Sequence, residues 1–391
     1  MEFSFPRTYG QQESRERLSQ ALAQGRFPHA LLVHGEPGLG QHALLLDLAQ
    51  ILSCESTDTK PCDNCYACKA FLNASLESLL YLFPIITPNK SEDKELNEAQ
   101  LEEIAKYIPL WHENPYGFSF PEKAVVRVMQ SRELLRPMGF SKKGNLPRIV
   151  FIPYFEVMGD EASNALLKML EEPPTDTYFL IATENRAALM PTLLSRCMHL
   201  GLSPLSPTEF RETAAALSAK VGKSLSERLL PFAEGSPGVY LDLLENGGEG
   251  LLEETANFLA AATAPDWRIF ADYAATVEGL EDAADLLQFL LRCVRVHQSM
   301  KARHAGPMKG REDGYRWTAQ ALEAEGWEAS LSVPLGPLED VANLPAFTAY
   351  LQTALQAVRG YSQPKIALLG LFLEYERAST PLHAGHGGNK E

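Results

Sequence analysis

The chain has 391 residues, which is enough for two or three domains with hydrophobic cores of their own. Its apolar fraction of 45% and charged fraction of 22% are ordinary for a globular protein. No apolar run is long enough to cross a membrane, and no secretion signal opens the sequence, so a cytoplasmic location is expected. The net charge of −15 argues against a large DNA-binding face on this chain, because such a face needs clustered lysine and arginine.

The first half of the chain alternates helix and strand signals. An amphipathic helix is predicted at 11–24, and an apolar strand at 29–34 leads into a glycine-rich turn and a helix at 43–52. Three more strands and one more helix are predicted, the strands at 148–152, 177–183 and 197–202 and the helix at 160–171. Each strand is nearly all apolar, which is typical of a parallel sheet buried on both faces. The expected fold class is therefore α/β.

Strand signals stop at residue 206, and helical periodicity follows over 206–298 and 340–377. We expect an α/β core at 1–205, a small helical lid at 206–250 and an all-helical domain at 251–378. Two stretches interrupt the pattern and are interpreted as insertions. The first, about 84–123, is irregular around a charged helical stretch at 95–107 and is expected to be largely surface-exposed, and the second is 300–340. The Gly- and His-rich tail, 379–391, is predicted to be disordered.

The glycine-rich turn from Gly35 through Gly38 and Gly40 to Gln41 and His42 has the spacing of a phosphate-binding loop. A working loop reads G-x4-G-K-[ST], where the lysine reaches the β- and γ-phosphates and the hydroxyl holds Mg²⁺. Gln41 brings no charge and His42 no hydroxyl. The loop therefore indicates a nucleotide-binding scaffold that has given up hydrolysis. Because backbone N–H groups alone can hold an anion, the sequence leaves nucleotide binding itself open.

A second part of a hydrolysing site is also missing. Such ATPases need an acidic pair where the next strand ends, one carboxylate for Mg²⁺ and one for the attacking water. Here the strand at 148–152 runs into Pro153 and Tyr154, which can do neither. Glu156 and Asp160 lie several residues further on, and an ATPase that uses them instead is the alternative hypothesis.

Four cysteines fall within fifteen residues, at positions 54, 62, 65 and 68. The spacing C-x7-C-x2-C-x2-C suits tetrahedral Zn²⁺, which takes four thiolates from short loops of this kind. With all four positions filled by Cys54, Cys62, Cys65 and Cys68, the metal has a structural role. Four free or redox-active thiols are the alternative.

One arginine follows the strand at 177–183 by a short turn, in the sequence Ser195-Arg196-Cys197. A lone arginine is most often a surface charge or half of a local ion pair. It can also act as an arginine finger that enters the nucleotide site of a neighbouring subunit. Position alone does not decide between these roles.

Taken together, these motifs resemble the δ′ subunits of the bacterial DNA polymerase III clamp loader, which are AAA+ proteins. The resemblance rests on Tyr9-Gly-Gln-Gln12, Phe27-Pro-His-Ala-Leu31, the four cysteines after the phosphate-loop helix, Asn164-Ala-Leu-Leu-Lys-Met-Leu-Glu-Glu-Pro-Pro174, Thr183-Glu-Asn185 and Ser195-Arg-Cys197. It covers residues 5–240 well and the C-terminal helices weakly.

The resemblance implies a role for several residues. Arg196 would act in trans on the ATP of a motor subunit, residues 183–185 would hold the first sensor, and Gly238 would stand where motor subunits carry the arginine of the second sensor. The implied fold is an AAA+ core with a helical lid and an oligomerisation collar at 251–378. The implied cofactor is structural Zn²⁺.

The function that follows is that of a non-catalytic stator, without ATPase activity of its own, in the DNA polymerase III holoenzyme. Its expected partners are γ/τ-like motor subunits and a δ-like subunit, with the sliding clamp and primed DNA reached through the assembly. Two other hypotheses remain, an active AAA+ motor using Glu156 or Asp160, and a zinc-containing DNA-binding adaptor, which the acidic balance of the chain disfavours.

Overall fold

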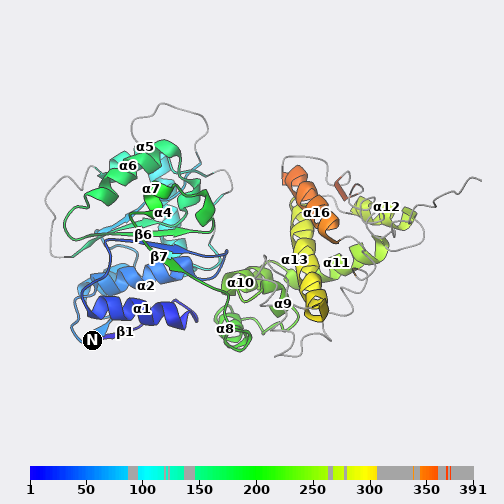
Figure 1. Cartoon of the computed structure of the whole chain (residues 1–391), viewed down its shortest axis with the longest axis horizontal. Coiled ribbons are helices and arrows are strands. Elements are labelled where there is room, and N and C mark those ends of the chain that lie inside the picture. The colour runs from blue at the N-terminus through cyan, green and yellow to red at the C-terminus, as the bar shows by residue number, and fades with distance from the viewer. Residues whose placement is uncertain are drawn as a thin grey trace, which may run out of the picture. The chain divides into compact units, whose positions relative to one another are not determined.

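The computed structural model describes residues 1–86, 96–118, 120–121, 124–135, 146–262, 267–276, 280–305, 338, 344–359, 367–368 and 370. These residues form two compact units, which Figure 1 shows with the chain coloured from its N-terminus. The first unit contains residues 1–205 together with 236–241. The second contains residues 206–235 and the described residues from 242 onward.

A five-stranded parallel sheet forms the centre of the first unit. Its strands, in spatial order, are β4 (Leu79–Tyr81), β5 (Arg148–Ile152), β6 (Thr177–Thr183), β2 (Ala30–His34) and β7 (Met198–Gly201). Every neighbouring pair is parallel, and Leu31 lies opposite Leu180 in the central pair. The predicted α/β class with a parallel sheet is confirmed. The bounds of β5 and β6 agree with the sequence analysis, which missed β4.

Both faces of the sheet are buried, as the apolar strands predict. Leu31 and Val33 of β2 belong to one hydrophobic cluster, whereas Ala30 and Leu32 belong to the other, because successive side chains of a strand point to opposite faces. The first cluster includes Leu44 and Leu48 of helix α2 (Gln41–Ser53), and the second includes residues of helices α6 (Asp160–Glu171) and α7 (Pro191–Leu194). Figure 1 shows α2 on one side of the sheet and α6 and α7 on the other.

The first unit also contains helices α1 (Gln12–Ala23), α3 (Tyr66–Leu72), α4 (Glu98–Glu113) and α5 (Val128–Leu135). Helices α1, α2 and α6 were predicted, and α4 overlaps a predicted helical stretch, whereas α3, α5 and α7 were not predicted. Helix α6 has the predicted bounds, and it buries Ala162, Leu166, Met169 and Leu170 on one face. Two short strands that the sequence analysis missed, β1 (Glu2–Phe3) and β3 (Thr59–Lys60), pair in parallel and join the N-terminus to the segment that carries the cysteines.

The stretch 84–123 was expected to be irregular around a charged helical stretch at 95–107, and largely exposed. The helix is present, but the expected exposure is wrong for part of the stretch. Helix α4 begins with a capping box, in which Asn97 and Gln100 each accept a hydrogen bond from the other's backbone N–H at 3.0 Å. The helix continues to Glu113, and Trp111 near its end is fully buried in the cluster on the α2 side of the sheet. Leu101 and Leu110 of the same helix are half exposed. Helix α4 therefore covers part of the hydrophobic cluster with one face and exposes the other.

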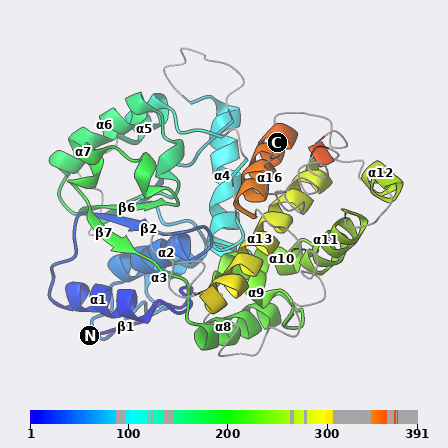
Figure 2. The same cartoon turned by 45° about the vertical axis from the view of Figure 1, so that its right-hand side comes forward.

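All the regular secondary structure among the described residues of the second unit is helical, in agreement with the predicted change at residue 206. Its helices are α8 (Pro207–Lys220), α9 (Leu230–Ala233), α11 (Gly248–Ala262), α12 (Trp267–Thr276), α13 (Leu280–Ala305) and α16 (Leu344–Arg359). Ser206 caps α8, with Pro207 in the first helical position. Helices α13 and α16 lie side by side (Figure 2), joined by hydrogen bonds from Gln298 to Thr348 and from Arg359 to Gln288.

Helix α10 (Pro237–Glu245) bridges the two units in sequence, because its residues up to Leu241 cluster with the first. The separate lid at 206–250 and helical domain at 251–378 stay a prediction. Most of the stretch 300–340 and all of the tail 379–391 lie outside the described residues. Within the described part of the chain, no helix has both the length and the apolarity that a bilayer span requires.

Candidate functional site: a closed phosphate loop, a cysteine cluster and an anchored arginine

The predicted phosphate loop lies between strand β2 and helix α2, where such loops place phosphates at a helix N-terminus. Gly38 and Gly40 both adopt positive φ, 76° and 102°, which explains glycine at these positions. Gly40 is the N-cap of α2, and no side chain caps this helix. The loop therefore keeps its backbone form although its catalytic side chains have changed.

Gln41, in the position of the phosphate-binding lysine, is turned back into the loop. Its Nε2 donates to the carbonyl oxygens of Gly35 at 2.9 Å and Glu36 at 2.7 Å, and the side chain is buried. A lysine in a working loop extends towards phosphate oxygens instead. Gln41 thus stabilises the loop by bonding its own carbonyls.

His42, in the position of the Mg²⁺-binding hydroxyl, is buried and bonds to the end of strand β5. Its Nε2 lies 3.0 Å from the carbonyl oxygen of Pro153, and its ring packs edge-on against Tyr154 at 4.6 Å between centroids. Burial lowers the pKa of His42 to about 4, so the ring is neutral at pH 7. Pro153 and Tyr154 follow strand β5, at the positions where a hydrolysing ATPase would carry its acidic pair. The residues at the two positions that lack catalytic groups therefore pack against each other.

The outer side of the loop is covered by other parts of the first unit. Gly238 N donates to the carbonyl oxygen of Gly38 at 2.9 Å, and Ser236 Oγ donates to that of Pro37 at the same distance. A Cβ at Gly238 would lie 2.6 Å from Gly38 Cα, and one at Gly40 would lie 2.8 Å from the hydroxyl of Tyr116. The position expected for the second sensor is thus closed by backbone packed on backbone.

Tyr116 is the residue of this cover that the sequence analysis did not find. It lies just after helix α4, and its hydroxyl oxygen accepts a hydrogen bond from the backbone N–H of Tyr9 at 2.9 Å. Its ring also packs against that of Tyr9. Burial raises the pKa of the Tyr116 phenol, which therefore stays protonated at neutral pH. Tyr116 is so distant from Gly40 in the sequence that no local signal could have revealed the contact.

The acidic residues of the alternative hypothesis have other contacts. The carboxylate of Glu156 accepts a hydrogen bond from Glu184 N at 3.0 Å, and Asp160 begins helix α6. Burial, and then the charge of Glu156, raise the pKa of Glu184 to about 7. At the expected first sensor, Thr183 is buried and Asn185 Oδ1 caps the turn that follows, accepting from Ala188 N at 3.3 Å.

The four predicted cysteines come together. The sulfur atoms of Cys54, Cys62, Cys65 and Cys68 all lie within 4.8 Å of one another. Four thiolates bound to one tetrahedral Zn²⁺ at ~2.3 Å would stand about 3.8 Å apart, so the cluster fits the metal closely. Hydrogen bonds from Asn64 and Cys65 N–H groups lower the pKa of Cys62 to about 6, which favours the ligating thiolate. These residues form a four-cysteine group that could hold a metal ion.

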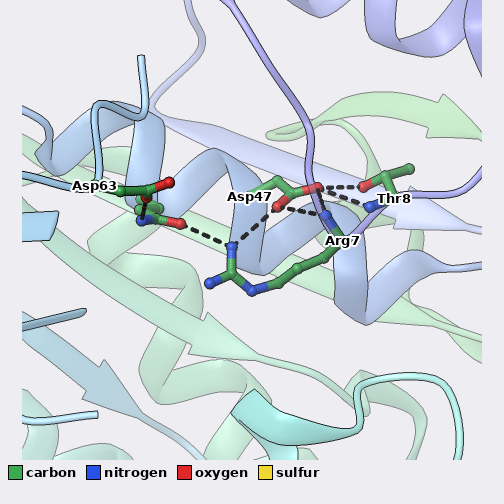
Figure 3. Close-up of polar contacts among 5 residues, drawn as sticks. Arg7, Thr8, Asp47 and Asp63 are labelled. Carbon is green, nitrogen blue, oxygen red and sulfur yellow. Dashed lines mark hydrogen bonds and ion pairs between the residues drawn. The ribbon is translucent and has the colours of Figure 1, made fainter. Parts of the chain in front are cut away.

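A buried polar network, absent from the sequence analysis, fixes this cysteine segment to helix α2 and to the N-terminal segment (Figure 3). Asp47 of α2 is fully buried and accepts from Thr8 Oγ1 at 2.7 Å and from Arg7 at 3.1 Å. Arg7 also donates to Gln50 at 2.7 Å, and Gln50 donates to Asp63 at 2.7 Å. Asp47 is the only charged residue of α2, and a buried carboxylate needs such partners. That isolated charge was the signal available in the sequence.

Arg196 lies just after helix α7, with 30% of its side chain exposed. Its Nη1 donates to the carbonyl oxygen of Thr192 at 2.6 Å and to Ser195 Oγ at 3.2 Å, and its Nη2 pairs with Glu171. Cys197, the next residue, is buried in the hydrophobic cluster that contains α6 and α7. The guanidinium is thus attached to a rigid part of the core, and part of it faces solvent.

Comparison with known proteins agrees with this picture. A family model described as DNA polymerase III, delta subunit, matches residues 10–206. The delta′ subunit of Yersinia pestis is 31% identical over 176 residues, 45% of this chain and 42% of that protein. The delta′ subunit of Escherichia coli (strain K12) is 26% identical over 254 residues, 64% of this chain and 65% of that one.

Relatives named tau and gamma match at similar levels. Subunit tau of Bacillus subtilis (strain 168) is 24% identical over 259 residues, 66% of this chain and 37% of that protein. A solved structure described as a DNA polymerase III gamma subunit-related protein from Thermotoga maritima aligns with a TM-score of 0.44 and 16% identity, covering 95% of this chain and 100% of that one. The chain spans 42% to 65% of the length of the delta′ relatives it matches.

The fold and the site together define a class, the AAA+ proteins, here with the loop strand β2 between β6 and β7 and a phosphate loop that lacks its lysine and hydroxyl. Within that class the family match covers half of the chain. The chain therefore belongs to the DNA polymerase III clamp-loader delta′ family.

Proposed function

We propose that this chain is a non-catalytic stator of the bacterial replicative clamp loader, which supports ATP-driven loading of the sliding clamp onto primed DNA. The observation that carries the proposal is the closed phosphate loop. Gln41 bonds the loop's own carbonyls, His42 bonds Pro153, and the backbone of Gly238 packs directly on Gly38. A triphosphate would have to displace these contacts, and no lysine or hydroxyl would then receive it.

The proposal includes a contribution in trans from Arg196. An arginine finger needs a guanidinium that reaches solvent but is held by its own subunit, since a preorganised donor stabilises transition-state charge without reorganising. Arg196 has that character, with partial exposure and three hydrogen bonds to its own chain. Its target would be the ATP bound by a neighbouring motor subunit.

The proposed partners are γ/τ-like motor subunits and a δ-like subunit, with helices such as α13 and α16 forming the oligomerisation collar. Relatives named tau and gamma are 24% and 25% identical to this chain, which supports a place in the same kind of assembly. We propose structural Zn²⁺ at the four-cysteine group, where the close approach of four sulfurs supports tetrahedral binding.

The test is ATP hydrolysis by the isolated chain, set beside hydrolysis by a clamp loader assembled with and without it. We expect background turnover from the isolated chain and full clamp-dependent turnover only from the complete assembly. Turnover by the isolated chain that disappears in Glu156→Gln or Asp160→Asn would instead establish the alternative, an ATPase with unconventional catalytic residues. Tight DNA binding by the isolated chain would favour the adaptor hypothesis.

A further inference from the structure

The segment Asn164–Pro174, the most specific motif in the sequence, has no role in the site described so far. It forms the second half of helix α6 and the residues beyond its C-terminus. Leu166 and Leu170 hold it in the core, and the carbonyl oxygen of Leu170 lies 3.2 Å from His29 Nε2 at the start of strand β2. Glu171, the last residue of the helix, is exposed. Its backbone is therefore fixed while its carboxylate lies at the surface.

Glu171 meets Arg196 across the surface between α6 and α7. The two side chains form an ion pair through Glu171 Oε1 and Arg196 Nη2. Both residues of the ion pair lie next to buried side chains. The same buried cluster contains Leu170, which precedes Glu171, Leu193 of α7, and Cys197, which follows Arg196. Short connections to a packed core restrict how far either group can move.

The position of Glu171 is electrostatically unfavourable without its partner. A carboxylate at the C-terminus of a helix faces the negative end of the helix dipole, and here Glu172 follows as a second acid. The positive charge of Arg196 offsets this cost. The acidic residue at this position is thus stabilised by one specific cation, Arg196.

The hydrogen bonds of the guanidinium define how it is presented. Both N–H groups of Nη1 are used, by Thr192 and Ser195, and Glu171 takes one of Nη2. The Nε group is buried, without a hydrogen-bond partner in the described part of the chain. One Nη2 N–H is thus left for an acceptor outside this subunit, and Glu171 fixes its direction by binding the other hydrogen of the same nitrogen.

We propose that Glu171 is the positioning residue of the arginine finger. It orients Arg196 so that the remaining Nη2 N–H points at the phosphate of a neighbouring subunit's ATP. The inference rests on the proposed function, because Arg196 must act in trans for its orientation to matter. Thr192 and Ser195 hold only the Nη1 end, so the loss of Glu171 lets the Nη2 end of the guanidinium tilt away without removing its charge.

The activity test uses clamp loaders assembled with the wild-type chain, Glu171→Ala, Glu171→Gln, or the control Glu172→Ala. At the adjoining ATP site, we expect Glu171→Ala to lower kcat about ten- to a hundredfold with little change in KM, since a misplaced group loses transition-state contacts. Glu171→Gln keeps an acceptor oxygen and should retain part of the activity. Glu172→Ala removes the neighbouring acid but leaves the ion pair of the finger intact, so it should match the wild type.

A double variant separates positioning from a merely structural effect. Glu171→Ala combined with Arg196→Ala should be no slower than Arg196→Ala alone, because a positioning residue acts only through the group it positions. A second readout needs no partner. In the isolated chain, NMR of the arginine side chains should show restricted guanidinium motion at Arg196, and Glu171→Ala should increase that motion, chiefly at Nη2, while leaving the thermal unfolding midpoint unchanged.

The two hypotheses fail in different ways. Wild-type kcat in the Glu171→Ala loader, alongside a slow Arg196→Ala loader, would overturn the positioning role and leave the finger in place. Additive losses in the double variant would do the same. Wild-type kcat with Arg196→Ala itself would remove both the finger and its positioning residue.

Discussion

The phosphate loop and the Arg196 segment lie in the same unit, but their polar side chains have opposite environments. In the loop, the two side chains at catalytic positions are buried, and each bonds to a backbone carbonyl of the same chain. At Arg196, the guanidinium stays partly exposed on a buried support. In the loop, the side chains at catalytic positions contribute to packing, whereas at Arg196 the packing beneath the residue holds a charged group at the surface.

Under the proposed function, this contrast explains how a subunit without its own ATP hydrolysis can still contribute to hydrolysis by a neighbouring subunit. Hydrolysis needs several groups at once, and here a neutral His42 against Tyr154 replaces two of them. A finger needs a single arginine whose support is intact. Substitutions in the loop should therefore affect mainly stability, and substitutions at Arg196 should affect mainly the activity of the assembly.

Removing the finger should have the largest effect. Arg196→Ala should lower hydrolysis by ~10³–10⁵ at the one site it faces, although other sites mask part of this in bulk turnover. Folding and assembly should be normal, because an exposed ion pair contributes little to stability. Arg196→Lys should also fail, since an ammonium lacks the planar fork. The measurement is ATPase and clamp loading by reconstituted loaders, and equal rates with all three subunits would reduce Arg196 to a surface charge.

Loss of the metal should be the next largest effect, and it should be local. The purified chain should carry about one Zn²⁺, and Cys65→Ser should release it, because three thiolates hold the ion less tightly than four. Hydrogen exchange should then rise over residues 54–68 and, through the Asp63–Gln50 contact, near Arg7. Metal analysis and exchange mass spectrometry test this, and reduced fresh protein without zinc would refute it.

Acid should destabilise the closed loop. The pKa of His42 falls from 6.5 to about 4 on folding through burial, so the unfolded chain binds the proton first. The stability contributed by neutral His42 is present above pH 6.5 and is lost as pH falls through that value towards 4, up to about 3 kcal/mol. Denaturant unfolding at several pH values should show this loss, reduced in His42→Gln. Some slope should persist, since burial also lowers the pKa of His112 to about 4.

A methyl group at the closed sensor position should cost about 1–3 kcal/mol of unfolding free energy, the usual cost of overpacking. In Gly238→Ala the new Cβ would lie 2.6 Å from Gly38 Cα, and both partners are backbone. Gly250→Ala is the matched control, because a Cβ there meets nothing within 4 Å and the residue is helical. Denaturant melts compare the two. Equal stability of Gly238→Ala and wild type would mean that the loop is not packed shut.

The smallest expected effect is on activity after partial repair. Gln41→Lys restores a cation to the loop, but Pro153 and Tyr154 still supply no ligand for Mg²⁺ and no base for water. ATP hydrolysis by the isolated variant should therefore stay at background, with a slight loss of stability from two lost hydrogen bonds. A phosphate-release assay tests this, and turnover after the single change would show that the second defect is not real.

Four of the five strands in the central sheet could be predicted, and so could the absence of the lysine and the hydroxyl from the phosphate loop. Both depend on local residues. The bounds of β5, α6 and β6 follow from short apolar or amphipathic runs closed by proline or turn residues. Gln41 and His42 identify a disabled loop through their position alone. The cysteine cluster follows from its spacing, since neighbouring ligands must come from a short segment.

The contacts that close and support the site could not be predicted, because they join residues far apart in the chain. Tyr116 covers Gly40 from a stretch that was expected to be exposed, and Gly238 reaches Gly38 across 200 residues. Strand β4 was missed because three residues carry too little periodicity. The ion pair of Glu171 with Arg196 depends on the packing of α6 against α7, which no spacing encodes.

Equilibrium binding of Mg·ATP to the isolated wild-type chain, measured by titration calorimetry or with a fluorescent analogue, distinguishes a closed loop from one that receives nucleotide. The closed loop predicts no saturable binding at millimolar nucleotide, because Gln41, His42 and Gly238 already occupy the contacts that phosphates would need. Saturable micromolar binding that Gly38→Ala abolishes would contradict the account, since it would show that the loop opens and still receives nucleotide.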